Sequence, residues 1–232
     1  GIPYEKSLLI PNAVSIKRVD FKHRFFENNK IKILYISRLD NDKIPSLMSF
    51  LEAVPELHKR FDLEINIIGD GEKYKVIQEI VDEINTSLKL TVINMIGGTT
   101  ETEYYIKKSD IVIGVGRVIL EAIALGRFAI CLGNNYYPGL VDKELLLKIS
   151  EVNFTDRNSK RVFNPDNFID DTSNLVMNLD YELDKLKETY EYVVSKFSDR
   201  VSAIKHEECY HDVINNYVPK ENLGEHWDIS KN

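Results

Sequence analysis

The chain has 232 residues, of which 43% are apolar and 29% are charged, and its formal net charge is −7. This length suits one large α/β domain, or at most two small ones, with enough apolar residues for a core that needs no disulfide bonds. An acidic chain without a basic run argues against nucleic acid as the main partner, and no apolar run approaches the roughly 20 residues that a membrane-spanning helix needs.

The first predicted unit is a strand, a loop and a helix. Ile31–Ser37 is a short apolar run, typical of a buried parallel strand. The following loop carries Arg38 and Lys43, and such loops lie at the carboxyl ends of strands, where open α/β sheets bind ligands. Two cations there can neutralise a diphosphate. The alternative is a pair of ordinary surface cations beside Asp40 and Asp42.

Two more strands are predicted from the same pattern, at Leu63–Gly69 and Leu90–Gly98, each followed by a glycine-containing turn and a helix. The turn Gly69–Glu72 can lie against a ligand, although tight strand-to-helix turns favour glycine in any case. After the third strand, Thr100 is predicted to cap a helix, with Glu103 three residues further on.

The most informative stretch comes next. It predicts a strand over Asp110–Ile113, a turn over Gly114–Gly116, a helix from Arg117 and a buried strand over Phe128–Leu132, with Gly126 at a helix end that needs positive φ. Glycines let a ligand approach the backbone, and a helix N-terminus offers unpaired N–H groups and partial positive charge. The stretch therefore predicts an anion site, most naturally for phosphate.

Glu121 is the one charged residue inside that otherwise apolar helix and needs a partner. One candidate is Arg117, four residues earlier on the same face, as an ion pair. The other is a ligand diol, because one carboxylate can accept hydrogen bonds from two adjacent hydroxyls. The residues alone leave both readings open.

The remaining third of the chain is less regular. A glycine- and proline-bearing loop, a short helix, a mostly irregular stretch and two helices are predicted over residues 134–141, 142–150, 153–171, 179–197 and from 199 onward, before a loose tail over 218–232. The alternation of strands and helices predicts the α/β class with a doubly wound parallel sheet and extra carboxyl-terminal helices. Residues 1–217 are expected to form one domain.

Five motifs in order resemble the carboxyl-terminal, donor-binding domain of GT-B glycosyltransferases, the retaining kind in family 4 (group 1). They cover Leu9–Val14 (LIPNAV), Ser37–Ile44 (SRLDNDKI), Ile67–Glu72 (IIGDGE), Met95–Gly98 (MIGG) and Arg117–Gly126 (RVILEAIALG). The likeness runs from about Leu8 to Tyr217 and implies a Rossmann-like half of such an enzyme, with residues 1–29 as the linker from a missing amino-terminal domain.

The resemblance implies roles for individual residues. Arg38 and Lys43 match the arginine and lysine that hold the donor diphosphate and act in catalysis, and Glu121 matches the glutamate that binds the ribose. Gly69 lies in the matching glycine turn. Gly97 belongs to the segment whose backbone borders the base.

The tip of the motif helix, Gly116, Arg117 and Val118, is expected to contact the phosphates. A variant subgroup with a similar glycine-rich loop adds Asn135 and Tyr137, with Gly139, as donor-site candidates. The family often has an acid eight positions before the ribose glutamate, where this chain has Ile113. That acid commonly touches the transferred sugar. The departure at Ile113 therefore concerns which sugar is bound and whether it is transferred.

The resemblance implies a transferase that moves a sugar from a UDP- or GDP-type nucleotide sugar to an acceptor, as in polysaccharide biosynthesis, without a metal or bound cofactor. The amino-terminal acceptor domain is expected to be missing, since the chain opens with Gly1, so the isolated domain should bind donor but catalyse little. Peripheral membrane association through that domain stays open. Two alternatives remain: a nucleotide-sugar epimerase, and a non-catalytic module that recognises a nucleotide or a partner.

The two cysteines, Cys131 in a predicted buried strand and Cys209 in a late helix, have no metal-ligand spacing. Free thiols of this kind favour the reducing cytoplasm.

Overall fold

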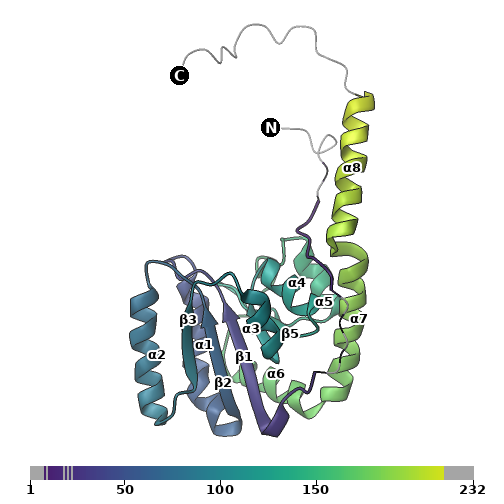
Figure 1. Ribbon diagram of the computed structural model, residues 1–232. Coiled ribbons are helices and arrows are strands. Elements are labelled where there is room, and N and C mark those ends of the chain that lie inside the picture. Colours follow the sequence, from purple (N-terminus) through teal and green to yellow (C-terminus); the bar gives the residue numbers. More distant parts are fainter. Residues whose placement is uncertain (1–7, 9, 18, 20, 22, 217–232) are drawn as a thin grey trace, which may run out of the picture.

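The computed structural model describes residues 8, 10–17, 19, 21 and 23–216. Within these ranges the chain forms a six-stranded sheet with helices on both faces (Figure 1). The strands are β1 (Lys30–Ile36), β2 (Asp62–Ile68), β3 (Ile93–Gly97), β4 (Ile111–Gly114), β5 (Phe128–Cys131) and β6 (Gly139–Leu140).

The sheet order is β3-β2-β1-β4-β5-β6, and every neighbouring pair is parallel except β5 with β6. The chain adds strands to one side of β1 and then crosses to the other side, where β4 pairs with β1 through Ile33 and Ile111. In open α/β sheets, ligands bind outside the carboxyl ends of the strands at such a reversal. The topology therefore directs attention to the loops after β1 and β4.

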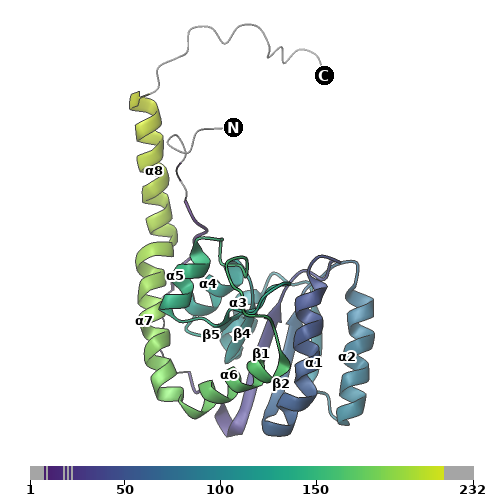
Figure 2. The ribbon, with the colours of Figure 1, turned by 180° about the vertical axis from the view of Figure 1, so that it is seen from behind.

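Two apolar layers cover the sheet (Figures 1 and 2). The helices α1 (Ile44–Arg60), α2 (Tyr74–Leu88) and α6 (Pro165–Met177) contribute to one layer. The helices α3 (Thr102–Lys108), α4 (Arg117–Ala124), α5 (Lys143–Ser150) and α7 (Leu179–Phe197) contribute to the other. Side chains of a strand alternate between faces, so Ile33 joins the first layer and Leu34 the second.

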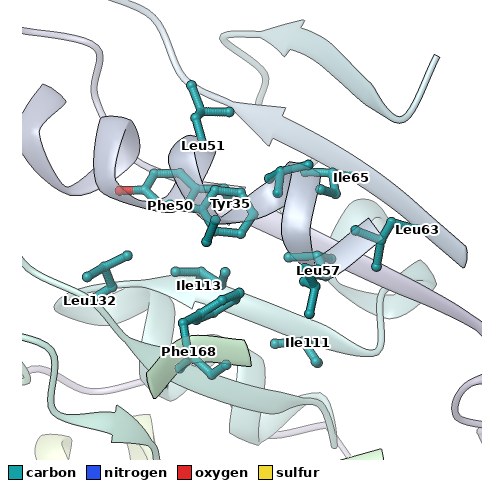
Figure 3. Close-up of a cluster of buried hydrophobic side chains, with 14 of the residues drawn as sticks. Tyr35, Phe50, Leu51, Leu57, Leu63, Ile65, Ile111, Ile113, Leu132 and Phe168 are labelled. Carbon is teal, nitrogen blue, oxygen red and sulfur yellow. The ribbon is translucent and has the colours of Figure 1, made fainter. Parts of the chain in front are cut away.

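Aromatic rings fill the first layer directly below the carboxyl end of β1 (Figure 3). The ring of Tyr35 stacks on Phe50 of α1 at 5.5 Å, and Phe50 meets Phe168 of α6 edge-on at 5.6 Å. The Tyr35 hydroxyl and the Ser46 hydroxyl are hydrogen-bonded at 2.8 Å, and burial raises the pKa of Tyr35 well above its usual value. These rings fix the position of α1, and with it the loop that carries the predicted cations.

Helix α8 (Asp199–Asn216) extends beyond the sheet and helices as a continuation of α7 (Figures 1 and 2). Its start is tied to the amino-terminal segment, because Val14 N donates to Phe197 O at 2.9 Å and Asp199 N donates to Val14 O at 3.0 Å. Among the described helices, none is long and apolar enough to cross a membrane.

The predicted fold class is confirmed, and α4 begins at Arg117 as expected. The third strand is shorter than predicted, because the Asn85 side chain accepts hydrogen bonds from Val92 N and Ile93 N at 2.9 and 3.0 Å and holds the chain before it in a turn.

The predicted Thr100 cap is wrong. Glu101 is the N-cap of α3, and its side chain makes no capping hydrogen bond. Thr99 Oγ1 accepts a hydrogen bond from Glu101 N.

Two elements depart from the prediction. Helix α6 begins within the stretch expected to be mostly irregular and continues past its end at residue 171, and its N-cap is Asn164, whose side chain accepts from Asp166 N. The short strand β6 lies in the predicted glycine-bearing loop. The predicted tail, 218–232, lies outside the described residues.

Candidate functional site

A polar cavity lies at the carboxyl ends of β1, β4 and β5, where the sheet reverses; we call it the strand-end cavity. The polar residues that line it come from three segments of the chain. They are Ser37, Lys43 and Ser46 beside β1, Asn134 and Asn135 after β5, and Thr155, Asp156 and Arg157 before α6. Gly114 and Val115 form the side nearest to α4. The cavity therefore combines cations with hydrogen-bonding groups at the edge of the sheet where the topology predicts a ligand.

The tip of α4 borders this cavity. Its N-cap, Gly116, has φ +68° and ψ −135°, a conformation that glycine adopts readily, and Gly116 N donates to Phe154 O at 2.7 Å. Within the described residues, the N–H groups of Arg117 and Val118 have no hydrogen-bond acceptor. Two free donors at a helix N-terminus form a place for an anion.

The two predicted cations are engaged with neighbouring carboxylates. Arg38 lies 3.1 Å from Asp40 and 3.7 Å from Asp42, and Lys43 lies 3.3 Å from Asp42. Lys43 lines the strand-end cavity, whereas Arg38 is two-thirds exposed and lies outside its lining. The local ion pairs that were the alternative to a ligand role are thus present, and a diphosphate would compete for the same two cations.

Glu121 lines a second cavity, on the other side of the α4 tip, together with Arg117, Thr100 and residues of the amino-terminal segment around Ser15. Arg117 Nη2 lies 3.3 Å from Glu121 Oε1, so the ion pair predicted as one alternative exists here. Burial raises the pKa of Glu121, and the Arg117 charge only partly opposes that shift. An ionised carboxylate in this position gains from further hydrogen-bond donors, which a ribose diol would supply.

The two predicted glycines join adjacent strand ends. Gly69 N donates to Gly97 O at 3.1 Å, and a Cβ on Gly69 would lie 2.0 Å from Ser37 O. Gly69 therefore allows the loop after β2 to pack against the loop after β1. Gly97 has φ +82° and ends β3. Neither residue lines the two cavities described above.

The loop after β5 is held by a buried carboxylate. Asp156 Oδ2 accepts hydrogen bonds from Asn135 N and Tyr136 N, both at 3.0 Å, and Asn135 lines the strand-end cavity. Tyr137 does not line it. Its ring is fully buried, and its hydroxyl donates to Asp171 Oδ2 at 2.9 Å, which gives this side chain a role in packing; we leave Tyr137 out of the proposed site.

The segment Thr155–Arg157 lines the cavity although no sequence motif pointed to it. Arg157 is exposed, and within the described residues it has no carboxylate partner. The segment lies far along the chain from the recognisable motifs, in a stretch predicted as mostly irregular. The one available sequence signal was an acidic residue directly followed by a basic one. Ordinary surface loops contain the same combination.

Comparisons with known proteins show the family and the fold of this chain. A family model of the group 1 glycosyl transferases matches residues 30–152, more than half of the chain. No curated protein sequence gives a significant match. Many solved structures are similar.

A glycosyltransferase from Rickettsia africae is 21% identical with a TM-score of 0.61, covering 82% of this chain and 49% of its own. A TarM variant from S. aureus, solved with UDP and other ligands, is 19% identical with a TM-score of 0.63 (88% and 39%). Anabaena HepE in complex with UDP and glucose is 13% identical with a TM-score of 0.58 (79% and 49%).

These structures share the fold, and the present chain spans half or less of the length of each. The family match, the reversal of the sheet at β1 and β4, and the polar cavity at that point lead to one conclusion: this chain belongs to the group 1 glycosyl transferases.

Proposed function

We propose that this chain is the donor-binding domain of a glycosyltransferase and binds a UDP- or GDP-type sugar nucleotide across the tip of α4. The observation that carries the proposal is the position of that tip. Gly114 and Val115, directly before the tip, line the cavity that contains Lys43, and Arg117 at the tip lines the cavity that contains Glu121. The N–H groups of Arg117 and Val118 have no acceptor within the described residues. A nucleoside diphosphate has the matching order of groups, with phosphates between the sugar and the ribose.

The diphosphate would lie against the α4 tip. Lys43 supplies a point charge, and Arg38 supplies a planar pair of donors once the ligand displaces Asp40 and Asp42. When the bond between the sugar and the diphosphate breaks, negative charge builds on the leaving phosphate. In this proposal, Lys43, Arg38 and the N–H groups of the α4 tip stabilise that charge, and a metal ion is not required for the task.

The ribose would lie in the second cavity. There the Glu121 carboxylate can exchange its contact with Arg117 for two hydroxyl donors of the ribose. Arg117, released from Glu121, is then free to approach the phosphates. The solved structures of TarM and HepE contain UDP, which supports a uridine nucleotide as the first ligand to test.

The acceptor side of the reaction belongs, in this proposal, to an amino-terminal domain that lies outside this chain. This chain covers 49% of the length of the Rickettsia africae glycosyltransferase, and the amino-terminal segment at Val14 is hydrogen-bonded to the junction of α7 and α8. The active cleft would lie between the two domains, so this chain alone is expected to bind donor but transfer little sugar. Membrane association through that domain and a cytoplasmic location, which the free thiols of Cys131 and Cys209 favour, belong to the same proposal.

A non-catalytic nucleotide-binding module is the second candidate, and one observation favours it. The position of the family's additional acid is occupied by Ile113, which is completely buried in β4. A product assay on the complete protein separates the candidates: a transferase moves the sugar to an acceptor, an epimerase returns an altered nucleotide sugar, and a binding module does neither.

Nucleotide binding is tested by thermal-shift titration with UDP and GDP. Either nucleotide should raise the melting temperature of the wild type, and Arg38→Ala and Lys43→Ala should reduce that shift. Lys59→Ala is the matched control, since Lys59 is an exposed cation paired with Glu56 in the last turn of α1. Indifference to both nucleotides, or equal losses in all three variants, would remove the donor-site proposal.

A further inference from the structure

Asp156 is a buried carboxylate whose two oxygens have different surroundings. The residue is only 8% exposed, and it lies so close under the loop after β5 that a Cβ on Gly133 would be 2.0 Å from its Cγ. Oδ2 accepts two backbone hydrogen bonds, from Asn135 N and Tyr136 N. The carboxylate is thus fixed in one orientation by the main chain.

The other oxygen, Oδ1, has no hydrogen-bond donor or cation among the described residues. Oδ1 is also not completely buried. Among the described side chains, His58 Nδ1 is the only nitrogen or oxygen atom that is both completely buried and without a hydrogen-bond partner. Asp156 lines the strand-end cavity, so its carboxylate lies within reach of a ligand bound there. An acceptor held in this way is ready for a donor that arrives with a ligand.

The charge of the carboxylate limits what that donor can be. A phosphate would be repelled at this point, and the phosphates already have Lys43 and the α4 tip. A sugar hydroxyl is neutral and donates a hydrogen bond. Thr155, next to Asp156 in the chain, and Asn135, whose N–H donates to Asp156, also line the cavity and offer further polar groups of the kind that sugars need.

We propose that Asp156 accepts a hydrogen bond from a hydroxyl of the transferred sugar and thereby selects the donor sugar. The inference rests on the proposed function, because it assigns the sugar part of the same ligand. The contact would also supply an acidic group to the sugar from the loop before α6. The position in β4 where the family often has its acid is the buried Ile113 in this chain.

The decisive variant is Asp156→Asn. The asparagine oxygen can still accept from Asn135 N and Tyr136 N, while its amide places a donor where Oδ1 was an acceptor. The variant should keep the wild-type melting temperature. Asp142→Asn is the matched control, since Asp142 also accepts a backbone hydrogen bond, from Leu145 N, but lies at the start of α5 away from this cavity.

Affinities of UDP, UDP-glucose, UDP-galactose, UDP-N-acetylglucosamine and GDP-mannose are measured by calorimetry. For the sugar nucleotide that the wild type binds best, Asp156→Asn should lose about tenfold in affinity, with the affinity for the free nucleotide within twofold of wild type. Asp142→Asn should change neither.

A second measurement does not depend on the variant's stability. Analogues of the best sugar nucleotide in which one hydroxyl is replaced by fluorine, which cannot donate, should include one position that weakens binding to the wild type but causes no further loss in Asp156→Asn. Equal losses of sugar nucleotide and free nucleotide, or additive losses for every fluorinated position, would show that Asp156 only holds the loop. If the wild type binds none of these nucleotides, the proposed function fails, and this inference fails with it.

Discussion

The two walls of the strand-end cavity differ in the state of their charged groups. On the first wall, formed by Ser37, Lys43 and Ser46, Lys43 lies against Asp42, and the neighbouring Arg38 lies against Asp40 and Asp42. On the second wall, Gly133–Asn135 with Thr155–Arg157, Asp156 Oδ1 and the Arg157 guanidinium have no partner within the described part of the chain. A ligand must displace internal partners on the first wall, whereas the second wall is already free to bind it.

The largest effect is expected from Gly133→Ala, which would break the second wall. The new Cβ would lie 2.0 Å from Asp156 Cγ and within 2.4 Å of both carboxylate oxygens, so the loop or the carboxylate must move. We expect a loss of about 3 kcal/mol in the free energy of unfolding, measured by urea denaturation.

Gly98→Ala is its control. There the new Cβ meets only the exposed Asp70, at 3.1 Å, and the expected loss is below about 1 kcal/mol. Unchanged stability of Gly133→Ala would contradict the close contact on which the second wall depends.

Arg157→Ala tests whether the free cation contributes more than the paired one. Arg157 needs no release from a carboxylate, so its removal should weaken UDP binding about tenfold, against about threefold for Arg38→Ala. Calorimetry at constant salt measures both. Lys160→Ala, which removes an exposed cation that does not line the cavity, should have no effect. A greater loss in Arg38→Ala than in Arg157→Ala would reverse the proposed difference between the walls.

Asp42→Asn should make the first wall resemble the second. Asp42 lies within 3.7 Å of Arg38 and 3.3 Å of Lys43, so its removal takes away the carboxylate beside Lys43 and leaves Arg38 with Asp40 alone. We expect UDP affinity to rise roughly two- to fivefold, in keeping with the small energies of exposed ion pairs, and the gain to shrink in high salt. Asp62→Asn, which breaks an exposed pair with Lys30 at the opposite end of the sheet, should leave affinity unchanged. Weaker binding by Asp42→Asn would mean that Asp42 orients the cations.

The smallest effect concerns Glu121 and pH. Burial raises the pKa of Glu121 in the folded chain, so the folded state binds a proton more readily than the unfolded state, and stability is lost as pH rises through that folded pKa. Glu121→Gln lacks this dependence. Its melting temperature relative to wild type should therefore increase between about pH 4 and pH 7, by roughly 2 °C or less. A relative decrease over the same range would show that the Arg117 ion pair outweighs the burial of the carboxylate.

The sheet could be predicted from the sequence because its signals are local. Each buried strand is a short apolar run. The start of α4 is marked by two adjacent residues, Gly116 with its positive φ and the charged Arg117. The cavity could be predicted only in part. The first wall lies in the recognisable loop around Lys43, next to its strand in the chain.

The second wall depends on contacts between distant residues. Asp156 meets Asn135 across 21 positions, and its environment becomes buried only because the loop after β5 folds over it. Tyr137 illustrates the opposite case: a loop tyrosine that looked available to a ligand is drawn into the core by Asp171, 34 positions later. Sequence spacing carries no record of either contact.

The central claim, that a nucleoside diphosphate binds at the tip of α4, is tested most directly by following the backbone amide resonances of Arg117 and Val118 during a UDP titration at constant pH. These two N–H groups have no acceptor within the described chain, so the account predicts that both resonances shift with nucleotide and saturate at the same concentration. Saturable shifts elsewhere in the chain, with the Arg117 and Val118 amides unmoved, would contradict it.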